Sequence, residues 1–171
     1  MRKVFAFCAF LLLLSTMQAQ DRYGHLNFGN LIAMMPETKD ADAQLEAYQK
    51  DLVSKGEAMA KEFQTEYTAF VQAVQEGNLP PIKQQEMQAV LEKKQQEIVA
   101  YEQEVAQLVN AKRQELLAPI VDKAQAAVDS VAQANNFLLV FDTSIFGAVL
   151  YAEESEDLMP LVKAALGITG E

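Results

Sequence analysis

The sequence predicts a mainly α-helical protein in which a long antiparallel helical hairpin projects from a small β body. Three observations predict this fold class. Residues 37–135 are rich in Ala, Gln, Glu and Lys, most of which favour helices. A Gly-Asn-Leu-Pro-Pro break at residues 77–81 divides that segment, and neither Gly nor two prolines continue a helix. Short β-rich runs lie before and after it.

Residues 1–19 have the pattern of a secretory signal peptide. Arg2 and Lys3 precede an apolar run from Val4 to Leu14, and small and polar residues lead up to Ala19. The run is too short to span a bilayer, so we expect a cleaved signal and an exported protein; the alternative is a buried N-terminal helix. The only cysteine, Cys8, would leave with the signal, which excludes disulfides and thiolate sites from the mature chain.

Residues 20–36 are expected to form the first strand and a short helix of the body. Tyr23–Phe28 alternates polar and apolar residues with the period of a half-buried strand. Asn30–Met35 fits a short helix, which Pro36 is expected to stop.

Residues 37–135 are expected to form the hairpin, with its turn near residues 77–81. Apolar residues recur at helical spacing in both halves, so each helix would carry one narrow apolar stripe. About forty residues at 1.5 Å each give an arm of roughly 60 Å, which has to project from so small a body. The stripe residues are Leu45, Tyr48, Leu52, Met59, Phe63, Tyr67, Phe70 and Val74, then Met87, Leu91, Ile98, Tyr101, Val105, Leu108, Leu116, Ile120 and Val131.

Residues 136–171 are expected to form two strands and a C-terminal helix. The strands are Phe137–Phe141 and Gly147–Tyr151, with turn residues 142–144 between them. An amphipathic helix follows over Leu158–Leu166 and ends at Gly167. A sheet of two or three strands is marginal alone, so we expect the first strand to pair with the late ones and the sheets of several copies to merge in an oligomer.

The charge of the chain restricts its partners. The net charge is −10, and without Arg2 and Lys3 the 14 basic residues become 12 against 24 acidic ones, which gives −12. Nucleic acids and anionic lipids need clustered Lys and Arg, so we expect no nucleic-acid partner.

The order of these segments resembles that of the Skp/OmpH family of periplasmic chaperones, over essentially the whole mature chain. The N-terminal block, with its Met35-Pro36-Glu37, is similar to the variants found in Bacteroidetes-type bacteria. The residues that carry the resemblance are Gly24–Ile32, Met35–Glu37, Lys123–Ala132, Phe137–Asp142, Leu150-Tyr151, Asp157-Leu158 and Leu166-Gly167.

The resemblance implies a homotrimer whose strands build a central β-barrel-like core, from which three hairpins hang as tentacles. It implies an ATP-independent holdase of the periplasm that encloses unfolded outer-membrane proteins after secretion and prevents their aggregation. The best-known members are basic, whereas the hairpin turn of this acidic chain offers only Lys83, which argues against lipopolysaccharide or membrane binding.

A holdase needs weak and adaptable contacts, for which Met and aromatic side chains are suited. The stripe also has a plain structural interpretation, in which it only packs one helix on the other. For the turn residues Leu79 and Ile82 the two interpretations are evenly balanced. The candidate client-binding residues are Met59, Phe63, Tyr67, Phe70, Val74, Leu79, Ile82 and Met87.

Nothing in the sequence predicts an enzyme, a metal site or a cofactor. His25 is the only histidine and fits a strand face, and Asp142 fits a turn cap. No nucleophile triad, HExxH pair or phosphate-binding loop is present. The alternative function is a structural or adaptor protein whose coiled-coil hairpin docks to one fixed envelope partner.

Overall fold

The computed structural model describes residues 22–77 and 79–168, and the predicted signal peptide lies outside them. The chain divides into two compact units, which we call the body (the described residues up to Leu31 and from Ala124 onward) and the hairpin (Ile32–Lys123). The elements are β1 (Arg22–Leu26), α2 (Phe28–Met34), α3 (Pro36–Gln75), α4 (Pro81–Ala134), β2 (Phe137–Asp142), the 3₁₀ turn η1 (Glu154–Glu156) and α5 (Met159–Ala165).

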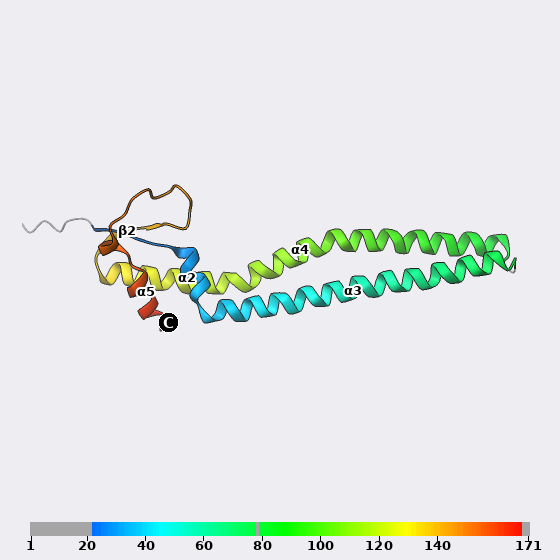
Figure 1. Ribbon diagram of the computed structural model, residues 1–171, viewed down its shortest axis with the longest axis horizontal. Helices are drawn as coiled ribbons and strands as arrows, with labels where there is room; N and C mark the ends of the chain where they lie inside the picture. Colours follow the sequence, from blue (N-terminus) through cyan, green and yellow to red (C-terminus); the bar gives the residue numbers. More distant parts are fainter. Residues whose placement is uncertain (1–21, 78, 169–171) are drawn as a thin grey trace, which may run out of the picture. The chain divides into compact units, whose positions relative to one another are not determined.

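The hairpin consists of α3 and the part of α4 up to Lys123, which lie side by side (Figure 1). Their contacts run in opposite directions along the two helices. Lys94 pairs with Glu62, the Tyr101 hydroxyl donates to the Leu52 carbonyl, and Lys123 pairs with Glu37. The antiparallel hairpin that the two stripes predict is therefore confirmed.

Both ends of α3 follow from local backbone chemistry. Pro36 does not only end the preceding helix, as expected, but is also the first residue of α3, where its missing N–H costs nothing. Glu37 in the first turn faces the positive end of the helix dipole. After Gln75 the chain turns at Gly77, whose φ of 68° is the left-handed conformation that glycine adopts without strain.

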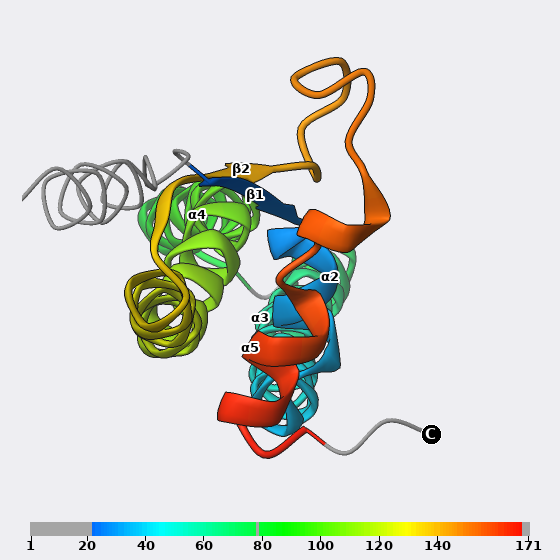
Figure 2. The ribbon, with the colours of Figure 1, turned by 90° about the vertical axis from the view of Figure 1, so that its left-hand side faces the viewer.

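The body contains a two-stranded parallel sheet of β1 and β2. Tyr23, Gly24, His25 and Leu26 pair with Leu139, Val140, Phe141 and Asp142 in order. Parallel neighbours need a long crossover connection, and here the chain between the strands includes both hairpin helices. The two strands lie side by side in Figure 2. The expected pairing of the first strand with a late strand is thus confirmed.

The other edge of β1 is also occupied. His25 and Asp157 form an isolated parallel bridge, and the Leu158 amide donates to the His25 carbonyl at 2.9 Å. Leu158 and Val162 are fully buried and anchor α5, and Gly167, with φ of 69°, follows the helix as expected.

The second late strand is not formed in the described chain. Residues 147–151 are irregular, and β2 is the only strand that follows α4 within residues 135–168. Both edges of β1 are taken, and residues 147–151 do not pair with the outer edge of β2 either. Residues 143–153 extend away from the sheet as a long loop (Figure 2, orange).

Candidate functional site

The eight candidate client-binding residues all belong to the hairpin, but they differ in exposure. Tyr67, Val74 and Ile82 expose 52%, 38% and 62% of their surfaces. Met59, Phe63, Phe70, Leu79 and Met87 are half-buried. These candidates therefore fall into two parts, a packed part that is half-buried in the hairpin and an exposed part that remains available to another chain.

The packed part has specific contacts around Tyr101. The Tyr101 hydroxyl donates to the Leu52 carbonyl at 2.9 Å, and the ring lies against Gly56, where an added Cβ would be 3.5 Å from Cε1. Burial, together with the nearby carboxylates of Asp51 and Glu104, raises the pKa of the Tyr101 phenol, so it stays neutral and remains a donor. These contacts pack α4 against α3 and so stabilise the hairpin.

An ion-pair cluster lies beyond this packed part, toward the turn. The Lys94 amine is 2.7 Å from a Glu62 oxygen and 2.6 Å from a Glu66 oxygen. Its hydrogen bonds to these two carboxylates, the one to Glu62 having the larger effect, raise the pKa of Lys94. The sequence could not reveal this cluster, because the partners are on different helices and the register between those helices was unknown.

A cavity of about 390 Å³ lies between α3 and α4 close to this cluster. One candidate residue, Met87, lines it. Sequence reasoning missed Val90, which also lines it and is 49% exposed, because Val90 lies beside the stripe rather than on it. The lining residues are Glu66, Ala69, Lys83, Glu86, Met87, Val90 and Leu91.

The body carries a second set of exposed apolar side chains that sequence reasoning did not select. On the loop, Phe146, Leu150 and Tyr151 are almost fully exposed. On the strands, Tyr23, Leu139 and Phe141 are about half exposed. Within the described residues, no backbone group pairs with the outer edge of β2. A cavity of about 640 Å³ is lined by Tyr23, Gly24, His25, Phe141, Glu156 and residues 148–153.

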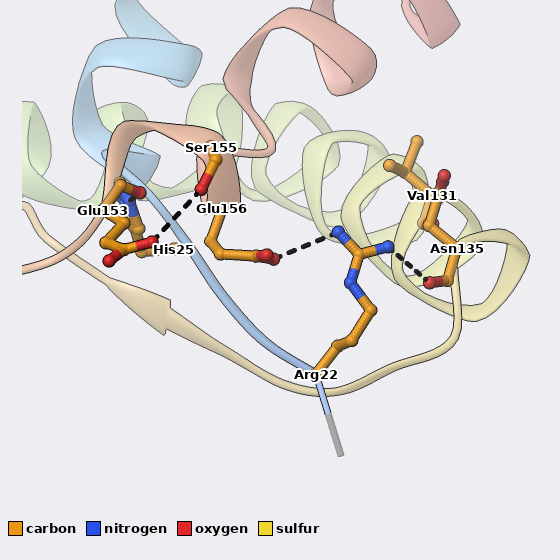
Figure 3. A network of polar contacts seen from close by, with 7 residues as sticks. All are labelled: Arg22, His25, Val131, Asn135, Glu153, Ser155 and Glu156. Carbon is orange, nitrogen blue, oxygen red and sulfur yellow. Dashed lines mark hydrogen bonds and ion pairs between the residues drawn. The ribbon is translucent and has the colours of Figure 1, made fainter. Parts of the chain in front are cut away.

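Polar contacts fasten the acidic end of the loop to β1 (Figure 3). Arg22 donates to a Glu156 oxygen at 3.1 Å and to the Asn135 carbonyl at 3.2 Å, and its guanidinium lies over the Phe137 ring. His25 Nε2 is 2.9 Å from the Glu153 carbonyl oxygen. His25 thus has the structural position that its strand location indicated.

Asp142, the last residue of β2, closes a turn, as its position directly after the Phe137–Phe141 run predicted. Its Oδ1 accepts from the Ser144 amide at 2.8 Å and from the Phe28 amide at 3.1 Å, and its Oδ2 accepts from the Ser144 hydroxyl at 2.7 Å. Partial burial opposes ionisation, but these hydrogen bonds outweigh it and lower the pKa of Asp142.

In the described part of the chain, no three His, Cys, Asp or Glu side chains are grouped so that they could hold a metal ion. None of the described helices is long and apolar enough to cross a bilayer.

Residues 22–166 match the model of a protein family described as "Outer membrane protein (OmpH-like)". A solved structure of a proposed OmpH-like outer membrane chaperone from Caulobacter crescentus superimposes with a TM-score of 0.72. The two chains are 18% identical, and the match covers 86% of this chain and 85% of the other. A search of curated protein sequences finds no significant match.

Proposed function

Because the chain belongs to the OmpH-like family of outer membrane proteins, we propose that it is a periplasmic holdase chaperone that works without ATP or a cofactor. It binds unfolded outer-membrane β-barrel proteins after their secretion and prevents their aggregation. The family match supports a chaperone role. The unfolded outer-membrane client and the ATP-independent mechanism are what the family resemblance implies, and the exposed apolar surfaces described above are compatible with them.

The observation that carries this proposal is the incomplete burial of the hairpin stripe. Two long helices pack through one narrow contact, and apolar side chains such as Tyr67, Val74 and Ile82 remain exposed beside it. Exposed apolar side chains without a fixed partner suit clients that differ in sequence. We propose that these three residues make the client contacts. When the packing between the two helices loosens, the half-buried candidates also contact the client; these are Met59, Phe63, Phe70, Leu79 and Met87.

We propose that the chain works as a homotrimer whose body strands build one shared core. The unpaired outer edge of β2 and the exposed loop side chains Leu150 and Tyr151 support this arrangement. An open edge next to exposed apolar residues is a liability that association removes. Residues 147–151, which have a strand-like sequence but no strand partner in one copy, would pair with an edge of another copy.

Light scattering during dilution of a urea-unfolded outer-membrane barrel tests the function. The mature chain without ATP should suppress the scattering at about one oligomer per client, and it should do so again with an unrelated barrel. If a folded and oligomeric chain leaves both signals unchanged, the holdase is excluded. The fixed-partner adaptor would then be the better explanation, because an adaptor protects only its own partner.

A further inference from the structure

Phe146 is a fully exposed aromatic side chain of the body, and the turn that carries it has a defined geometry. The Ala148 amide donates to the Ile145 carbonyl at 3.1 Å. Gly147, with φ of 78°, has the left-handed conformation that the third residue of such a turn requires. Phe146 is the second residue of the turn, and its full exposure means that it is not packed against its own chain.

The segment around Phe146 has the composition of a buried surface. Residues 143–152 contain no charged residue, although 22% of the chain is charged. Asp142 fixes the beginning of the segment by its hydrogen bonds to Ser144, and the Glu153 carbonyl is hydrogen-bonded to β1 at the other end. An aromatic side chain on a tight turn, in an uncharged loop that is anchored at both ends, suits the preorganised anchor of a protein interface.

A groove of about 380 Å³ lies between α4 and β2. Val128 and Ala132 of α4 line it on one side, and all six residues of β2 line it on the other. The outer edge of β2 has no backbone partner in the described chain. Leu138, which the irregular register leaves without a partner residue in β1, is 59% exposed. The remaining lining residues are Leu26, Phe28, Gln125, Asp129 and Gln133.

The charged groups of the groove already have partners within the chain. The Gln125 side-chain amide donates to the Asp129 carboxylate at 2.9 Å. The Asp142 carboxylate accepts hydrogen bonds from Phe28 and Ser144. An apolar side chain that enters the groove therefore need not leave these groups unsatisfied.

We propose that Phe146 of one copy inserts into the groove between α4 and β2 of a neighbouring copy. This inference rests on the proposed homotrimer and assigns to it a specific contact. In that trimer residues 147–151 pair with an edge of another copy, and the open edge of the described sheet is that of β2. Phe146 directly precedes these residues, so the pairing brings it to the groove that this edge borders.

Cross-linking between two single-cysteine variants tests the contact. The only cysteine, Cys8, lies in the predicted signal peptide, so the mature chain is a cysteine-free background. Ile145→Cys keeps Phe146 and introduces a thiol beside it, and Ala132→Cys introduces a thiol in the groove. The two variants are refolded together and treated with a short bismaleimide, and mass spectrometry identifies the linked peptides. We expect a cross-link between the two copies.

A matched control distinguishes the groove from the rest of α4. Ala126 is on the same helix and is exposed, but it does not line the groove. A mixture of Ile145→Cys with Ala126→Cys should give no cross-link above background. Adding Phe146→Ser to the Ile145→Cys chain should abolish the cross-link to Ala132→Cys, because the anchor is lost. Equal cross-linking of Ala126→Cys and Ala132→Cys would overturn the inference.

The strength of the assembly provides a second measurement. Phe146→Ser should raise the concentration at which half of the trimer dissociates by about tenfold, because an apolar ring is no longer buried. Tyr67→Ser, which removes a half-exposed aromatic ring from the hairpin, should leave that concentration unchanged. Analytical ultracentrifugation measures both, and circular dichroism checks that both variants are folded. Equal dissociation of the wild type and Phe146→Ser would contradict the insertion.

Three further outcomes separate this inference from the proposed function. If the chain is a trimer but Ile145→Cys and Ala132→Cys do not cross-link, the insertion is wrong and the trimer stands. If the wild type is a monomer at all concentrations, both fail. If Phe146→Ser stays as firmly trimeric as the wild type but no longer suppresses the aggregation of a barrel protein, Phe146 binds clients and the inference is overturned.

Discussion

At Gly24, β1 passes so close to Leu158, the residue before α5, and to β2 that a Cβ atom would lie 2.2 Å from Leu158 Cδ1 and 2.9 Å from two atoms of the Phe137 ring. Leu158 is fully buried and has little room to move. The sequence resemblance includes Gly24, but the steric reason for a glycine becomes visible only when Leu158, far away along the chain, is placed against it.

We expect Gly24→Ala to lower the free energy of unfolding by about 1–3 kcal/mol, because the added methyl group forces Leu158 out of its position. Urea denaturation followed by circular dichroism measures this. Gly29→Ala is the control: its Cβ would meet Ser144 Cβ at 3.4 Å and would favour α2. Equal destabilisation by both changes would show that close packing at Gly24 is not the cause.

Tyr101→Phe should lower the free energy of unfolding by about 0.5–1.5 kcal/mol, because it removes the hydrogen bond to the Leu52 carbonyl and keeps the ring against Gly56. Thermal unfolding provides the measurement. The control is Tyr67→Phe, which removes a hydroxyl from a half-exposed side chain and should have no measurable effect. A wild-type stability for Tyr101→Phe would mean that this hydrogen bond contributes nothing net.

At the scale of elements, α2 depends on two side chains for the hydrogen bonds of its first turn. Asn27 Oδ1 accepts from the Asn30 amide at 2.8 Å, which is an ordinary N-cap contact. The Phe28 amide donates instead to Asp142, at the end of β2. One carboxylate thus joins the start of a helix to the end of a strand.

The stabilising effect of Asp142 should depend on pH. Its folded-state pKa is lowered from the ordinary 3.8, so its contribution is present above pH 3.8 and is lost as the pH falls below that value through the folded-state pKa. We expect Asp142→Asn to be less stable than the wild type at pH 6, and the difference to shrink on acidification. Urea unfolding at several pH values measures it. A difference independent of pH would mean that the charge is unimportant.

Elements with strong local signals could be predicted from the sequence, and those that depend on distant partners could not. The long helices, the break after Gly77 and the stop at Gly167 follow from periodicity and from glycine and proline chemistry. The prediction of a strand at Gly147–Tyr151 was wrong, because a β-rich sequence shows only that a segment is able to pair with another strand and not that it does so. The cavity beside Val90 depends on helix register, which the stripes left undefined.

At the scale of the whole molecule, the exposed loop predicts association. Leu150 and Tyr151 are 94% and 82% exposed, although neighbouring large apolar side chains are seldom so exposed to solvent on a monomeric protein. Analytical ultracentrifugation of the mature wild type should give three times the mass of one chain. Leu150→Ser with Tyr151→Ser should shift the protein to the monomer, because the apolar contact is lost.

The control for association removes a similar apolar surface from the hairpin. Val53→Ser with Val99→Ser changes two side chains that are about half exposed, and this variant should keep the wild-type mass. A wild type that stays monomeric at all concentrations would contradict the proposed trimer. A trimer that survives the loop changes would place the interface elsewhere.

The parallel pairing of β1 with β2 also determines the order in which a newly made chain can acquire its structure. Contacts between α3 and α4 begin close to the turn and can spread outward, whereas β1 has to wait until Phe137–Asp142 arrives. N-terminal segments emerge first, so β1 spends the whole interval without a partner. During that interval the chain itself exposes an unpaired strand with apolar residues, which is the condition that the protein is proposed to control in others.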